Sequence, residues 1–118
     1  MRRVDPALLL ILLGTIRLSA HSGADHAADH AADLKEFFNR SCAACHGEDG
    51  SGRGPNGQRL GGKDLANPRW QVRTRDSQMA EIILRGKGPM PAFGSLMSET
   101  EALKLVSEVI RPMAAKKH

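Results

Sequence analysis

Apolar residues recur at helical spacing in three stretches of the chain. The first runs from residue 31 to about 43, the second from 74 or 76 to 85, and the third from 98 to 112. In each stretch the apolar side chains are three or four positions apart, which places them on one face of a helix. The inward positions are Leu34, Phe37 and Phe38; Met79, Ile82 and Ile83; and Leu103, Val106, Val109 and Ile110. No alternating stretch of useful length predicts a strand, so the expected fold class is all-α.

Capping and breaker residues indicate where these helices begin and end. Ser98 and Glu101 have the spacing of a capping box, which starts the third helix. Gly86 is expected to end the second helix and Pro112 the third. After the first helix, the stretch GEDGSGRGPNGQRLGG holds seven glycines and a proline in sixteen residues. That density of breakers predicts a long loop whose backbone passes close to a bulky group.

The first twenty residues have the pattern of an export signal. A basic start at residues 1–3 is followed by an apolar run over residues 8–16 and by small residues around residue 20. The apolar run is far shorter than the roughly 20 residues of a spanning helix, so no stable membrane span is expected once the signal is cleaved. This pattern predicts a periplasmic protein, with an uncleaved amino-terminal segment as the alternative.

The remaining chain divides by composition. Residues 21–32 are expected to form a flexible linker, residues 33–113 the domain, and residues 114–118 a tail. The linker contains the near-repeat DHAADHAAD, in which His26 and His30 would share a face of a helix. No third metal ligand is evident nearby, so we favour a polar linker or an extension of the first helix over a metal site.

Charge is distributed unevenly along the chain. The formal net charge is +4, but residues 53–87 carry eight basic and three acidic residues, a net of +5, whereas residues 21–52 are net −4. Such a basic segment can steer an acidic partner, although a mixed solvated surface would have the same composition. Nucleic-acid binding is excluded, because no basic cluster is interleaved with stacking aromatic residues.

The segment CAACH contains the chain's two cysteines, Cys42 and Cys45, followed at once by His46. A disulfide across so small a loop would add little stability, and a zinc site would lack a fourth ligand. A thiol–disulfide exchange motif fits an exported chain but normally lies in a βαβ setting. C-x-x-C-H is also the attachment signature of a covalent haem. We favour the haem, with a haem-free thiol–disulfide protein as an alternative.

Met90 is the candidate for the second axial position of such a haem. A thioether opposite an imidazole favours Fe(II) and suits electron transfer. Met90 lies in the loop sequence GKGPMPAFG, between Pro89 and Pro91, where a methionine is poorly placed as core filler. Met79 and Met97 are expected in the core instead.

These segments together resemble the class I c-type cytochromes, in particular the small bacterial monohaem group. The resemblance covers residues 33–113 and rests on FFNRSCAACHG, GSGRGPNG, DSQMAEIILRGKGPMPAFG and SETEALKLVSEVIRPM. It implies a small helical domain with long Gly-rich loops around one haem c. It further implies thioether bonds from Cys42 and Cys45, with His46 and Met90 as the iron ligands.

The resemblance also implies that the first and last helices cross beside the haem edge, with Phe38 at the crossing. The chain departs from the family at Val109, where an aromatic residue is usual. The Pro55 carbonyl is the implied acceptor for the second N–H of His46. Trp70 is a candidate donor to a haem propionate, with an ordinary core tryptophan as the alternative.

The function that follows is one-electron transfer between redox proteins by an iron that cycles between Fe(III) and Fe(II). Such a protein is a carrier rather than an enzyme, and it binds no small-molecule substrate. A closely related alternative is an electron-accepting cytochrome subunit of a periplasmic oxidoreductase complex, with the same haem and a fixed partner.

Overall fold

The structure is a computed structural model that describes the backbone of residues 23–116 and the side chains of residues 30–116. The expected export signal at residues 1–20 lies outside these residues. The helical elements are α1 (Gly23–Ser41), α2 (Ala43–His46), α3 (Pro68–Arg73), α4 (Asp76–Arg85), α5 (Glu99–Leu105), the π-helical turn η1 (Val106–Ile110) and the 3-10 helix η2 (Arg111–Lys116). Within the described residues there are only isolated β-bridges and no strand, so the all-α prediction is confirmed.

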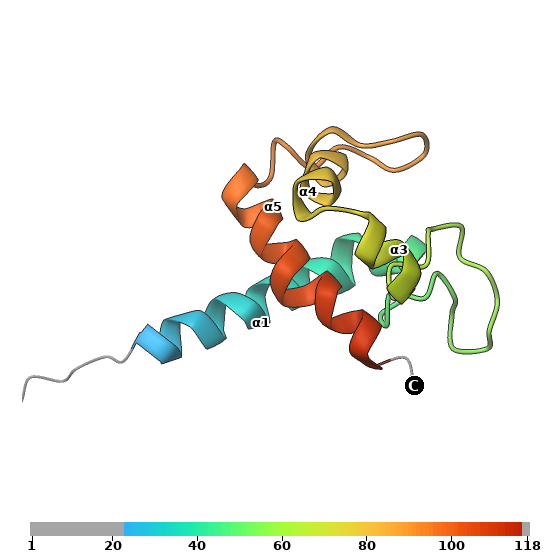
Figure 1. Cartoon of the computed structure of the whole chain (residues 1–118), viewed down its shortest axis with the longest axis horizontal. Helices are drawn as coiled ribbons and strands as arrows, with labels where there is room; N and C mark the ends of the chain where they lie inside the picture. The colour runs from blue at the N-terminus through green and yellow to red at the C-terminus, as the bar shows by residue number, and fades with distance from the viewer. Residues whose placement is uncertain (1–22, 117–118) are drawn as a thin grey trace, which may run out of the picture.

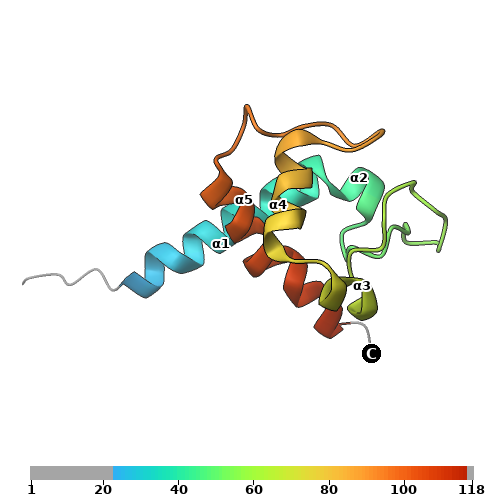
Figure 2. The same cartoon turned by 45° about the horizontal axis from the view of Figure 1, so that its top comes forward.

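The first and last helices cross, as the resemblance implied. Figure 1 shows α1 passing beside the rod formed by α5, η1 and η2, and α1 contacts both α5 and η1. Helix α4 also packs against α5 and η1. Figure 2 shows that the amino-terminal part of α1 extends beyond the body of the domain, while its carboxyl end leads into α2.

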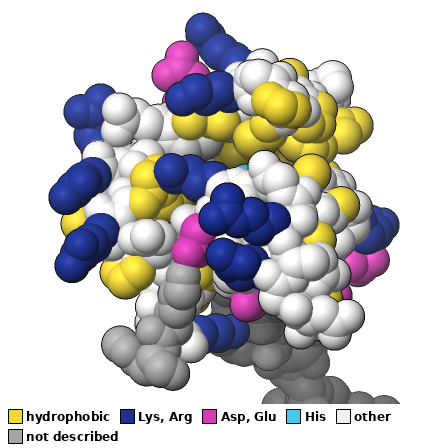
Figure 3. Space-filling model, turned by 90° about the vertical axis from the view of Figure 1, so that its right-hand side faces the viewer, with side chains coloured by type: hydrophobic (Ala, Val, Ile, Leu, Met, Phe, Trp, Pro, Cys, Tyr) yellow, Lys and Arg dark blue, Asp and Glu magenta, His cyan; other side chains and the backbone are white. Residues whose placement is uncertain are grey.

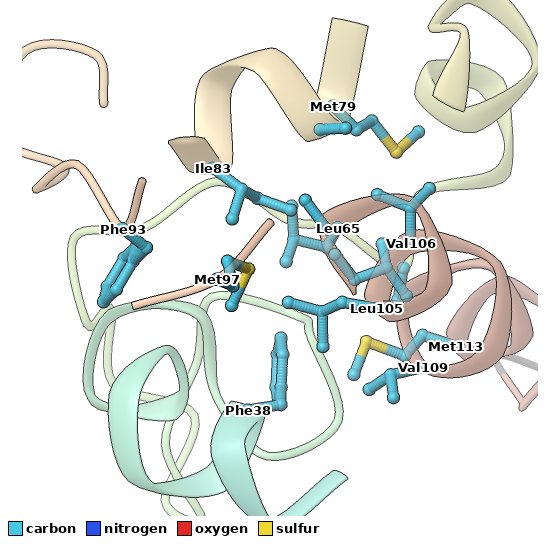
Figure 4. Packing of buried hydrophobic residues seen from close by; sticks show 14 residues of the cluster. Phe38, Leu65, Met79, Ile83, Phe93, Met97, Leu105, Val106, Val109 and Met113 are labelled. Carbon is cyan, nitrogen blue, oxygen red and sulfur yellow. The ribbon is translucent and has the colours of Figure 1, made fainter. Parts of the chain in front are cut away.

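The core lies where α1, α4 and the C-terminal rod meet. Phe38, Leu105 and Val106 are its largest fully buried side chains. Met79 and Met97 are buried in the same cluster, which confirms them as core residues. Figure 4 shows Phe38 from α1, Met79 from α4, and Leu105 and Val106 from the rod around one core, with Met97 added from the loop before α5. Among the described residues, no helix is long and apolar enough to cross a membrane.

Met113 also belongs to this core, although the sequence had not placed it there. The expected end of the last helix at Pro112 is wrong, because the chain continues as η2. Figure 4 shows the side chain of Met113 beside that of Val109, and both are buried. A Cβ on Gly50 would lie 2.5 Å from the Met113 sulfur, so this methionine packs on the loop after α2.

Local signals set most of the other helix ends. Ser98 and Glu101 form the predicted capping box, and Gly86, with φ +75°, ends α4 as predicted. Helix α1 begins at Gly23 rather than near residue 31, so this part of the predicted linker is helical. Its repeated alanines have the highest helix propensity of any residue, which explains the extension.

Helix α3 was not predicted from the sequence. The Asn67 side chain accepts hydrogen bonds from the backbone N–H groups of Arg69 and Trp70, and Pro68 occupies the first helical position. Both features are standard signals of a helix start. The helix is only six residues long, too short for a periodic apolar pattern to reveal it.

Candidate functional site

The CAACH segment forms a single helical turn at the end of α1. The Cys42 N–H donates to the Phe38 carbonyl at 2.8 Å, and the His46 N–H donates to the Cys42 carbonyl at 3.0 Å. Both cysteines are free thiols, Cys42 half-buried and Cys45 exposed. Burial raises the pKa of the Cys42 thiol from 9.0 to about 11, so that thiol is protonated at neutral pH. The turn therefore presents two reduced thiols and an imidazole within five consecutive residues.

The imidazole of His46 is fixed by one ring nitrogen. Its Nδ1 lies 2.9 Å from the carbonyl oxygen of Lys63. A carbonyl can only accept, so Nδ1 carries the proton and donates it to this oxygen. In the neutral ring Nε2 is then the nitrogen without a proton, the form in which an imidazole binds a metal.

The acceptor is thus Lys63 and not Pro55, which corrects the sequence prediction. Arg53 and Arg59 pair in an antiparallel bridge, and Gly54 N–H donates to the Gln58 carbonyl at 2.9 Å. This pairing leaves Pro55 exposed at the tip of the loop. The histidine is contacted by Lys63, in the segment that follows the tip of the loop.

Gly62 allows the loop backbone to approach the CAACH turn. Its N–H donates to the Cys45 carbonyl at 2.8 Å. A Cβ at this position would lie 2.3 Å from the Cys45 carbonyl oxygen and 2.9 Å from Nδ1 of His46. Only glycine fits there without moving the backbone, and its neighbour Lys63 is thereby placed against the histidine.

Met90 lies at the end of a tight turn after α4. Lys87 N–H donates to the Met90 carbonyl at 3.1 Å, and Met90 N–H donates to the Lys87 carbonyl at 3.0 Å. The turn is anchored by Phe93, which is buried, donates its N–H to the Ile83 carbonyl at 2.9 Å and meets the Phe37 ring edge to face. Met90 is half-buried and, like Cys42 and Trp70, packs against the core cluster.

Trp70 is half-buried on α3, and the ammonium of Lys63 lies 5.2 Å from the centre of its indole ring. Its proposed bond to a propionate stays a prediction. Of the two amino-terminal histidines, His30 is exposed, and the side chain of His26 lies outside the described residues. Residues 30–116 contain no group of three or more His, Cys, Asp or Glu side chains that could hold a metal ion.

Comparison with known proteins shows the family to which the chain belongs. A family described as cytochrome c oxidase, cbb3-type, subunit III, matches residues 29–107, which include α2 and the Met90 turn. The chain belongs to this family. The resemblance to c-type cytochromes is confirmed, and the chain is a cytochrome c domain of the subunit III family.

Three relatives are subunits of cbb3-type cytochrome c oxidases. FixP of Azorhizobium caulinodans is 38% identical over 66 residues, which are 55% of this chain and 21% of that protein. FixPc of Rhizobium leguminosarum bv. viciae is 32% identical over 72 residues, 60% of this chain and 24% of that protein. CcoP of Cereibacter sphaeroides is 31% identical over 81 residues, 68% of this chain and 27% of that protein. The match therefore spans about a quarter of the length of these relatives.

A cytochrome c domain of this family implies a c-type haem, and the residues on the CAACH turn fit that group. Two reduced thiols are available for thioether bonds, and Nε2 of His46 is available for iron. Gly62 has no Cβ, so the loop can approach the turn closely enough for the Lys63 carbonyl to reach Nδ1 of His46. The chemistry of these donors is that of covalent haem attachment rather than of a closed zinc site.

Proposed function

We propose that this domain transfers single electrons through one haem c, held by Cys42 and Cys45, with His46 and Met90 as axial ligands. When bound, the haem supplies the Fe(III)/Fe(II) couple. His46 contributes an imidazole whose ring is oriented by its hydrogen bond to the Lys63 carbonyl. The fixed Nδ1 of His46, beside two free thiols in a member of a cytochrome family, is the observation that carries the proposal.

The role of Met90 is supported by its place in an anchored turn. Two backbone hydrogen bonds to Lys87 and the buried Phe93 hold this turn, which restricts where the thioether can lie. A thioether ligand stabilises Fe(II) relative to Fe(III) and so raises the reduction potential. Filling both axial positions suits electron transfer, whereas peroxidase or oxygen chemistry needs an open position.

An absorption spectrum tests this ligand set. The protein is to be expressed in a bacterium that attaches haem covalently, and oxidised. We expect a low-spin haem c spectrum with a thioether-to-iron charge-transfer band, which Met90→Ala abolishes. Met97→Ala is the matched control, because Met97 is a buried core residue and its loss leaves the band in place. A band that survives in Met90→Ala removes Met90 from the site.

We propose further that the domain works as an electron-accepting part of a periplasmic redox complex rather than as a free shuttle. The support is that its relatives are named as oxidase subunits. Export rests on the sequence pattern of residues 1–20. A tagged chain, produced at its native level, should co-elute on size exclusion with a catalytic subunit identified by mass spectrometry. Elution of the haem-containing chain alone would favour the shuttle.

The partner surface is proposed to be acidic. All eight basic side chains of residues 53–87 are exposed, whereas Asp76 in the same segment is paired with Arg111. Figure 3 shows Lys and Arg side chains over much of the side where the loop after α2 lies, with fewer Asp and Glu side chains. Opposite charges steer association, and salt screens them over a Debye length of about 8–10 Å.

The charge proposal is tested with ferricyanide as an anionic redox probe. Oxidation of the reduced protein should slow as ionic strength rises, and Arg53→Gln with Arg59→Gln should weaken that dependence. Arg40→Gln with Lys104→Gln is the matched control, since it removes the same charge outside the basic segment. Equal effects of the two pairs would show that only net charge matters.

A further inference from the structure

We infer that α3 is a positioning element for His46: Trp70 and Gln71 hold the segment 63–65, whose Lys63 carbonyl fixes the imidazole. The inference rests on the proposed role of His46 as an iron ligand. It adds two positioning residues, both on α3. Each step of the connection is a contact between described residues.

Gln71 holds the segment at Leu65. Gln71 is 6% exposed, and its Nε2 donates to the Leu65 carbonyl at 2.8 Å and to the Ile110 carbonyl at 2.9 Å. Both amide protons are therefore used, one on the loop and one on the C-terminal rod. Leu65 is also held from the other side, because its N–H donates to the Gly50 carbonyl at 2.6 Å.

Trp70, the preceding residue of α3, holds the segment at Lys63. The Lys63 ammonium lies over the indole ring, 5.2 Å from its centre, within the range of a cation–π interaction. Trp70 thus contacts Lys63, and Gln71 contacts Leu65. These two contacts restrict the movement of the Lys63 carbonyl, which accepts the hydrogen bond from His46.

Arg111 fixes α3 itself. Its guanidinium donates to the carbonyls of Gln71 and Thr74 at the end of α3, and it pairs with Asp76 at 2.6 Å. The connection therefore runs from the C-terminal rod through α3 to the loop and on to the histidine. The two Gln71 hydrogen bonds are buried and those of Arg111 are half-buried, and together they restrict the position of this segment.

Loosening this segment should change the reduction potential of the haem as well as the stability of the domain. A histidine that donates its second N–H to a carbonyl is a stronger ligand and stabilises Fe(III). Loosening the Lys63 carbonyl weakens that hydrogen bond and raises the reduction potential. A merely structural role for α3 would change stability without changing the potential.

Gln71→Met tests the inference, because methionine keeps the length of the side chain and removes its donors. Ser98→Ala is the matched control, since it removes the N-cap hydrogen bond of α5 and lies outside this connection. We expect Gln71→Met to raise the reduction potential and to speed hydrogen exchange of the Gly62 amide by about tenfold, the usual cost of one or two buried hydrogen bonds. Ser98→Ala should lower stability and leave both values unchanged.

Unchanged potential and Gly62 exchange in Gln71→Met would overturn the inference, as would an equal change in both variants. If Gln71→Met does not fold, Lys63→Met serves in its place: it keeps the carbonyl and removes the ammonium, and Gly62 exchange should still rise. Absence of a haem c spectrum in the unaltered protein would instead refute the proposed function. Hydrogen exchange of Gly62 needs no haem signal, so it tests the role of α3 even if the proposed function is wrong.

Discussion

Gly62→Ala should disrupt the site through a single methyl group. The new Cβ would lie 2.3 Å from the Cys45 carbonyl oxygen, 2.5 Å from the carbonyl carbon and 2.9 Å from Nδ1 of His46. Real Cβ atoms are almost never closer than 3.0 Å to such atoms, so the loop must move by about 0.7 Å from the nearest of them. The two nearest atoms are backbone and cannot rotate away.

This movement of the loop breaks two hydrogen bonds of the site, that of Gly62 to Cys45 and that of His46 to Lys63. Gly62 N–H donates to the Cys45 carbonyl at 2.8 Å, and a shift of about 0.7 Å takes that distance to the limit of a hydrogen bond. The neighbouring Lys63 carbonyl moves with it and loses His46. Overpacking of this kind costs about 1–3 kcal/mol and a lost hydrogen bond about 1 more, so we expect a loss of about 2–4 kcal/mol.

Urea denaturation of the haem-loaded protein, followed by circular dichroism, measures this loss. Gly54→Ala in the same loop is the control, because the three atoms nearest to its Cβ all belong to the side chain of Gln58, which can rotate away. We expect Gly54→Ala to stay within about 0.5 kcal/mol of the unaltered protein. Gly62→Ala with the same stability as Gly54→Ala would refute the close approach of loop and turn on which the site depends.

Two further predictions concern the C-terminal anchor and the thiols. Arg111→Met loses hydrogen bonds to two backbone carbonyls and the pairing with Asp76, and it should destabilise the domain by about 2–3 kcal/mol in urea denaturation; a loss under about 0.5 would contradict the network. In the reduced, haem-free chain, iodoacetamide should modify the exposed Cys45 before Cys42, whose pKa is raised by burial to about 11. The protonated Cys42 favours the folded state fully below its ordinary pKa of 9.0, and that contribution is lost as the pH rises toward 11. Equal modification rates would show that Cys42 is not buried.

Features that depend on neighbouring residues were predictable from the sequence. The capping box at Ser98 and the glycine stop at Gly86 are decided within one helical turn, and both are confirmed. The crossing at Phe38 was expected from the resemblance to c-type cytochromes and not from the apolar stripes, and α1 does contact both α5 and η1. The CAACH turn needed no long-range information, because its spacing alone brings both thiols and the imidazole together.

Features that depend on how distant segments meet were not predictable. Pro55 and Lys63 lie in the same Gly-rich loop, and only the folded path of that loop decides which carbonyl reaches His46. Helix α3 was missed although Asn67 and Pro68 signal its start, because its apolar pattern is too short. Met113 was not predicted as a core residue because Pro112 was taken as the end of the last helix, whereas a proline removes one N–H and the chain continues as a 3-10 helix.

The proposed haem c would be bonded to Cys42 and Cys45. The most direct measurement is haem staining of the denatured chain after electrophoresis, with the double variant Cys42→Ala and Cys45→Ala in the next lane. Covalent attachment predicts that the stain stays with the unaltered chain and is lost from the double variant. A chain that loses its colour on denaturation, or that was never coloured in a host able to attach haem, contradicts the account.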